Sequence, residues 1–255
     1  MATKQYKATR HWDNWLDFVR DAQLPGADNA DRQSQKEPSN NWDNDAGWQG
    51  AVDLANFGWK EGRDRFIKGV AFAPSIVDLG AAPTRAHGVV GYRPNIGRLM
   101  AGSPACMVRR GVDLTGGRPI VRLLIGVASS GNVRSSIIEN RGIAICSCVD
   151  QLESLGYQFE IVAHDGSALG QVRSDHTVVL KHAGESLDVD RISFALAHPA
   201  YARRLCFRIL EQDTNLWPAL SGGYGGVCDP TPEPGQILFP SLHAREARYY
   251  QDIDK

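Results

Sequence analysis

Residues 120–132 read Ile-Val-Arg-Leu-Leu-Ile-Gly-Val-Ala-Ser-Ser-Gly-Asn, and they decide the fold class. The run 120–128 is apolar apart from Arg122, which is typical of a strand buried in a sheet. A turn follows, and residues 133–155 then carry apolar side chains at helical spacing up to Gly156, where a helix is expected to end. This strand, turn and helix predict an α/β domain.

The rest of the chain continues the alternation of strands and helices. Short apolar runs predict three further strands, at 159–163, 177–181 and 237–239. The first of these is expected to close at Asp165-Gly166. Two segments on either side of Pro199, 190–197 and 201–212, predict helices. The order predicts a three-layer α/β sheet.

The N-terminal part is expected to be helical. Residues 11–21 and 50–68 carry apolar side chains at helical spacing, with a polar segment, 24–47, between them. We therefore expect residues 1–70 to form a helical extension packed on the core and residues 71–255 to form the α/β domain. Within 71–115, prolines and glycines predict turns, short strands and a short helix near 96–101.

Composition excludes several classes of protein. The 255 residues are 42% hydrophobic and 22% charged, which are ordinary values for a globular chain. No apolar run approaches the ~20 residues of a membrane helix, so no membrane partner is expected. The first ten residues show no secretory signal. The five cysteines form no Cys-x-x-Cys pair, which favours a reducing cytosol.

Positive charge is concentrated in one block. Residues 84–141 hold nine arginines, no lysine and two carboxylates, a net charge of +7, whereas residues 142–198 carry −5. Arginine makes forked contacts with phosphate and stacks on base faces. Such a block predicts a surface that attracts a polyanion, and an aromatic residue among arginines is typical of grooves that hold single strands. The candidate nucleic-acid-binding residues are Arg85, Tyr92, Arg93, Arg98, Arg109, Arg110, Arg118 and Arg134.

The alternative is that these arginines pair with the acidic block within one fold. Ion pairs of that kind are common. The protein would then be a protein-interaction module, with the acidic block 142–198 as its docking face. A third alternative is a metal-dependent enzyme that uses clustered carboxylates.

The turn after residues 120–128 stands where a von Willebrand factor A domain carries its Asp-x-Ser-x-Ser metal motif. Here Gly126 occupies the aspartate position and Ala128 the first serine position, so only Ser130 fits. Hard cations need carboxylate ligands. The layout therefore resembles that domain, and we expect no metal and no cofactor.

Other motifs have simple structural interpretations. Ser129 lacks the Gly-x-Ser-x-Gly elbow of a nucleophile. Cys146 and Cys148 fall within a predicted helix, where packing explains them. The glycine-rich segment 222–226 lacks the lysine and helix start of a phosphate-binding loop. We therefore expect a protein that is not an enzyme.

Six short segments resemble a family of phage proteins: 12–15, 51–55, 58–63, 91–97, 102–107 and 140–144. The resemblance spans roughly residues 11–210 and implies a helical N-terminal part followed by a degenerate von Willebrand A-like half. More narrowly, the chain resembles the Drc-like, single-stranded-DNA-binding cofactors of a phage RNA polymerase. That resemblance implies binding to melted promoter DNA, a phage RNA polymerase as partner, and the cytoplasm of an infected bacterial host. It assigns no binding residues.

Overall fold

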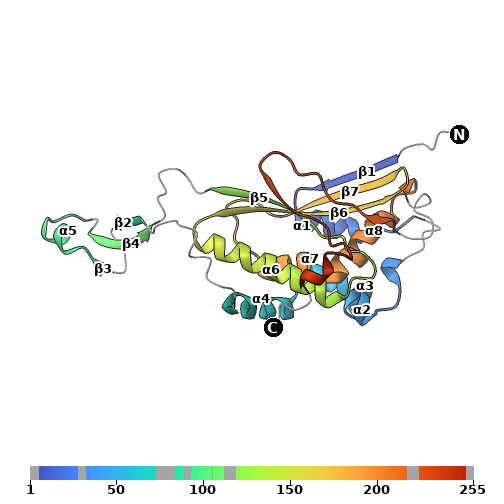
Figure 1. Ribbon diagram of the computed structural model, residues 1–255, viewed down its shortest axis with the longest axis horizontal. Helices are drawn as coiled ribbons and strands as arrows, with labels where there is room; N and C mark the ends of the chain where they lie inside the picture. Colours follow the sequence, from blue (N-terminus) through green and yellow to red (C-terminus); the bar gives the residue numbers. More distant parts are fainter. Residues whose placement is uncertain are drawn as a thin grey trace.

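The computed structural model describes residues 6–27, 33–72, 84–88, 93–104, 106–111, 119–216 and 224–250. The described residues form a main body around a six-stranded sheet and a separate three-stranded sheet (Figure 1). The expected α/β class is confirmed. No described helix has the length and apolar character needed to cross a membrane.

The six-stranded sheet is mixed. Its order is β1-β7-β6-β5-β9, with β8 paired to β6. The strands are β1 Tyr6–Trp12, β5 Ile120–Gly126, β6 Gln158–Leu169, β7 Val172–Lys181, β8 Gly226–Val227 and β9 Gln236–Phe239. β5 runs parallel to both β6 and β9, β1 runs parallel to β7, and β6 and β7 form an antiparallel hairpin.

Helices cover one face of this sheet (Figure 1). They are α1 Trp15–Ala22, α2 Asn40–Asp43, α3 Gly47–Phe57, α4 Lys60–Phe72, α6 Ser135–Ser154, α7 Val189–Ala197, the π-helical turn Tyr201–Cys206 and α8 Phe207–Glu211. Two 3-10 turns, Gln33–Gln35 and Ala247–Tyr250, complete the described helical structure of the body.

The described residues thus form two layers instead of the expected three. Leu123 and Ile161 point into the large core cluster shared with the helices, whereas their neighbours Leu124 and Val162 belong to a small cluster on the opposite face. Alternate residues of a strand face opposite sides of a sheet. The second face carries too little apolar surface for a layer of helices, because its positions toward the β6–β7 turn are polar.

The prediction that strand 159–163 closes at Asp165-Gly166 was wrong. β6 continues through both residues to Leu169, and the turn comes at Gly170, which has a φ of 60°. Gly166 lies inside the sheet. A Cβ at this position would stand 2.5 Å from Cε1 of His164, so the position requires glycine. This glycine permits a close approach instead of a turn.

The N-terminal part is more than a helical extension. Residues 6–12 form an edge strand where only helix was expected, and α1 begins after Asn14, whose side chain caps the helix by accepting from the Asp17 backbone N–H. The predicted helix 50–68 is two helices that meet at Gly58. The φ of Gly58 is 81°, and a Cβ at this position would lie 2.5 Å from Cβ of Asp190. Side chains of this part enter the same core as the rest of the body.

Gly142 sets the distance between α6 and α7. A Cβ at this position would stand 2.4 Å from Cα of Ala197. Overpacking of this kind costs about 1–3 kcal/mol, so Gly142→Ala is expected to lower the free energy of unfolding by that amount in urea denaturation. Gly131→Ala is the control, because no atom lies within 4 Å of its added Cβ. Equal stability of the Gly142→Ala variant and the wild type would contradict the packing argument.

Candidate nucleic-acid interface

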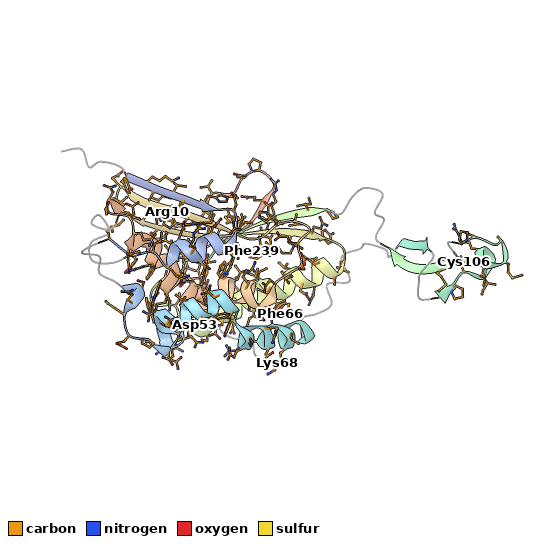
Figure 2. The ribbon with its side chains drawn as sticks, turned by 180° about the vertical axis from the view of Figure 1, so that it is seen from behind. Arg10, Asp53, Phe66, Lys68, Cys106 and Phe239 are labelled. Atoms are coloured by element: carbon orange, nitrogen blue, oxygen red, sulfur yellow. The ribbon has the colours of Figure 1, made fainter. Side chains whose placement is uncertain are left out.

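The three-stranded sheet and one short helix form a unit that we call the basic arm. It comprises β2 Thr84–Gly88, β3 Arg93–Pro94, α5 Ile96–Met100 and β4 Met107–Gly111, in the order β2-β4-β3 with both pairings antiparallel. The short strands and the helix near 96–101 were predicted, and they are confirmed. Figure 1 shows the arm apart from the main body, and Figure 2 shows the same separation from behind, with Cys106 on the arm.

The arm brings together five of the eight predicted binding residues: Arg85, Arg93, Arg98, Arg109 and Arg110. In the β2–β4 pairing, Arg85 stands opposite Arg110. In the β3–β4 pairing, Arg93 stands opposite Val108, next to Arg109 in the chain. Residues separated by up to 27 positions in sequence, Thr84 and Gly111, are therefore neighbours in one small sheet.

The remaining predicted residues lie elsewhere. Arg134 is exposed on the main body, directly before α6, so it is not part of the arm. Tyr92 and Arg118 lie outside the described residues.

The arm contains no carboxylate. Between residues 84 and 111 the sequence holds the five arginines and neither Asp, Glu nor Lys. None of these arginines can therefore form an ion pair within the arm. Arg98 is exposed, and no ion pair of the described residues includes it. The result is a small sheet whose positive charge its own residues leave uncompensated.

Two other arginines of the same block follow the alternative interpretation. Arg122 pairs with Glu160 across β5 and β6 at 3.6 Å. Arg141 is buried and donates to the backbone carbonyls of Gly126 and Pro240. Internal neutralisation or capping thus accounts for these two.

The arm also exposes apolar side chains. Ile96, Leu99 and Met100 of α5 are 62%, 50% and 82% exposed, although α5 is properly capped by Asn95, whose side chain accepts from the Arg98 backbone N–H. Sequence analysis did not identify these three residues, because only the absence of a packing partner distinguishes them from core residues. A surface with arginines and bare apolar side chains suits a ligand that has both charge and apolar faces.

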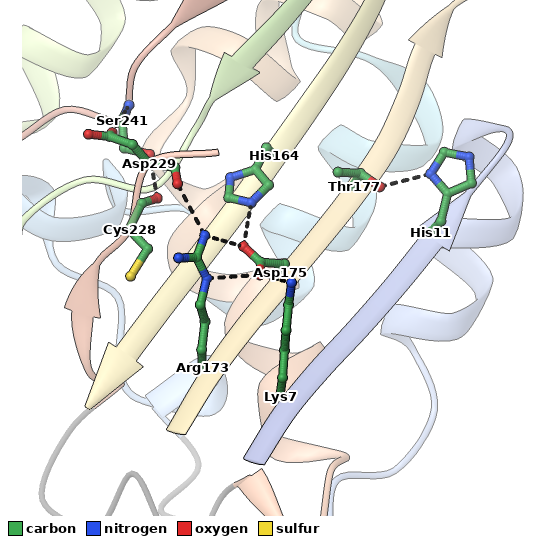
Figure 3. A network of polar contacts seen from close by, with 9 residues as sticks. All are labelled: Lys7, His11, His164, Arg173, Asp175, Thr177, Cys228, Asp229 and Ser241. Atoms are coloured by element: carbon green, nitrogen blue, oxygen red, sulfur yellow. Dashed lines mark hydrogen bonds and ion pairs between the residues drawn. The ribbon is translucent and has the colours of Figure 1, made fainter. Parts of the chain in front are cut away.

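A polar network on the sheet face away from the helices has a structural role (Figure 3). The Asp175 carboxylate accepts from Arg173 Nε at 2.8 Å, lies 3.1 Å from Lys7 Nζ, and contacts His164 Nε2 at 3.1 Å. Burial alone would raise the pKa of Asp175, but these hydrogen bonds lower it to about 2. The network joins β1, β6 and β7, so it fixes the edge of the sheet.

Catalysis has little support in this network. Burial raises the pKa of the Cys228 thiol, and burial lowers the pKa of His164. Cys228 offers its backbone carbonyl to Ser241, and Asp229 accepts from the Ser241 backbone N–H (Figure 3). Among the described residues, no group of three or more His, Cys, Asp or Glu side chains is placed to hold a metal ion.

Comparison with known proteins gives a family and no function. A family model described as a domain of unknown function (DUF7192) matches residues 2–254. No curated protein matches the chain. No solved structure matches it either.

Proposed function

We propose that this chain, which belongs to the DUF7192 family, binds single-stranded DNA through its basic arm. The observation that carries the proposal is the gathering of five arginines, four on the three-stranded sheet and Arg98 on α5, in an arm that has no carboxylate. Guanidinium groups bind phosphate in a forked geometry, and release of counterions from the strand drives such binding.

The elements of the arm favour a single strand over a duplex. α5 has five residues, too short to read a major groove in the way a recognition helix does. The exposed side chains of Ile96, Leu99 and Met100 offer apolar contact to bases, which only an unpaired strand presents freely. Phosphate contact from the strands and base contact from α5 would act together.

The biological setting of the proposal rests on the resemblance to phage cofactors. That resemblance implies action at melted promoters, a phage RNA polymerase as protein partner, and the cytoplasm of an infected bacterial host. A non-enzymatic binder fits this setting.

The alternative, an interaction module that docks through the acidic block 142–198, has weaker support. Most of its carboxylates are already engaged in ion pairs within the body. The pairs are Glu153–Lys181, Glu160–Arg122, Asp175–Arg173, Asp188–Arg191 and Asp190–Arg63. A docking face would have to compete with these partners.

The proposal predicts that Arg85→Ala combined with Arg110→Ala, at positions that stand opposite each other in the β2–β4 pairing, weakens binding of a fluorescently labelled 30-nucleotide strand at least about tenfold, since charge-assisted hydrogen bonds contribute about 1.5–3 kcal/mol each. Fluorescence anisotropy of the full chain across a salt series measures this. Each phosphate contact contributes about −0.7 to the slope of log affinity against log salt concentration. Loss of two contacts should therefore make the slope of the variant less steep by about 1.4.

Arg122→Ala is the matched control, because this exposed arginine belongs to the same block but pairs with Glu160 on the main body. Its affinity and salt slope should equal those of the wild type. If the double variant also keeps the wild-type affinity, the arm is not the binding surface.

A further inference from the structure

A cavity of about 370 Å³ lies beyond the carboxyl end of β5, in the main body and apart from the basic arm. Ser129 and Ser130 line it from the loop after β5, and Trp42 and Tyr224 contribute aromatic walls. Ligands of open α/β sheets bind at this end of the strands, and small-molecule sites span about 300–1,000 Å³. Position and size are therefore those of a ligand site.

One carboxyl side chain that lines the cavity has no hydrogen bond to any described residue. Asp165 of β6 is 4% exposed, and its Oδ2 has no hydrogen-bond partner among the described residues. Buried polar atoms in native proteins are almost always hydrogen-bonded, so this oxygen can accept from a donor that the described residues do not supply. Burial raises the pKa of Asp165 to about 7, so the carboxyl can hold or release a proton near neutrality.

A second charged side chain lines the same cavity. Arg203 is 2% exposed, and its guanidinium donates to the backbone carbonyl of Val133 at 2.8 Å and to the Ser129 hydroxyl at 3.4 Å. None of the ion pairs between described residues includes Arg203. Its hydrogen-bond acceptors are all neutral oxygens, and the Asp43 carboxylate acts on it without forming an ion pair, so the guanidinium can attract a further anion.

The backbone at Arg203 is unusual. Residues Tyr201–Cys206 form a π-helical turn. π-Helical turns are rare and are frequently found at functional sites. Here the turn supplies Arg203 to the cavity.

We propose that this cavity binds a small amphoteric molecule, with an N–H donor group held by Asp165 and an anionic oxygen near Arg203 and Ser130. Free amino acids and nucleoside monophosphates share this chemistry. The aromatic walls accommodate the apolar part of either. The site is independent of DNA binding by the arm.

Isothermal titration of the full chain with L-glutamine and, separately, with cytidine 5′-monophosphate tests the proposal. Binding of either probe is expected, and the probe that binds identifies the source of the ligand. Asp165→Asn should weaken that binding at least tenfold, whereas Asp53→Asn, an exposed carboxylate on α3, should leave it unchanged.

The number of protons released on binding distinguishes direct contact between Asp165 and the ligand from a merely structural role of Asp165. A donor nitrogen stabilises the ionised carboxylate, so binding near pH 7 should release up to about half a proton in the wild type. Repeating the titration in buffers of different ionisation enthalpy measures this release, and Asp165→Asn should show none. Absence of binding by both probes at millimolar concentration, or equal binding by Asp165→Asn, would overturn the proposal.

Discussion

Asp43→Ala is expected to lower the free energy of unfolding by about 3–5 kcal/mol, the usual cost of removing one partner of a buried ion pair. The Asp43 carboxylate accepts from Arg204 Nε at 2.8 Å, and both side chains are fully buried. The substitution would leave a guanidinium in the interior without its counter-charge.

Arg204 also ties the N-terminal part to the helical layer. Its guanidinium donates to the backbone carbonyls of Ser34, Lys36 and Glu37. Loss of Asp43 is therefore expected to loosen residues 33–43 as well. Amide hydrogen exchange would detect faster exchange in this segment, beside the change in unfolding free energy measured in urea.

The control for this prediction is Asp17→Ala, which removes an exposed ion pair with Arg20 on α1. Exposed pairs contribute about 0–1 kcal/mol. A second variant, Asp43→Leu with Arg204→Met, should stay destabilised, because the carbonyls of Ser34, Lys36 and Glu37 then lose their donor as well. The account of this pair would be wrong if Asp43→Ala were no less stable than Asp17→Ala.

Acid is expected to destabilise the protein through two buried imidazoles. Burial lowers the pKa of both His176 and His198 to about 4. The unfolded chain takes up these protons near pH 6.5, so their stabilising contribution is complete above that pH and is lost as the pH falls toward 4. At about pH 5, each histidine lowers the free energy of unfolding by about 2 kcal/mol relative to its value at neutral pH.

Asp165 acts in the opposite direction. Its folded pKa of about 7 lies above the unfolded value of 3.8, so the folded chain binds the extra proton and acidification relieves the cost of a buried charge. Lowering the pH from about 7.5 to 5 should raise the free energy of unfolding by about 2 kcal/mol through protonation of Asp165. The net acid sensitivity of the wild type is thus a difference of opposing contributions.

Single variants separate these contributions. His176→Leu should reduce the loss of unfolding free energy between pH 7.5 and 5, whereas Asp165→Asn should increase it, by about 2 kcal/mol each. Urea denaturation at the two pH values measures both. If both variants keep the pH dependence of the wild type, neither group titrates as its burial requires.

Much of the sheet's architecture could be predicted from the sequence. The continuous apolar run 120–128 and the long periodic segment 133–155 leave little choice but a buried strand and a helix, and both are present as β5 and α6. β1 was missed because its buried positions, Ala8 and Trp12, are separated by polar residues that give no alternating pattern. The β6 extension was missed because Asp165-Gly166 has the composition of a turn.

The candidate interface was predictable in composition but not in extent. Clustered arginines are visible in sequence, and the strand pairing of Arg85 with Arg110 places distant ones together. Arg134 belongs to the same block by charge, yet it lies on the main body, since charge counting along a chain cannot tell where a segment folds. The cavity at Asp165 and Arg203 depends on long-range packing, which no local pattern encodes.

The most direct test of the account compares one oligonucleotide in two forms. Fluorescence anisotropy of the full chain with a labelled 30-nucleotide strand, free and annealed to its complement, should show tight binding of the free strand at low salt and weaker binding of the duplex. Affinity for the free strand should fall linearly with the logarithm of salt concentration. No binding of the free strand at low salt, or equal affinity for the duplex, would contradict a single-strand interface on the arm.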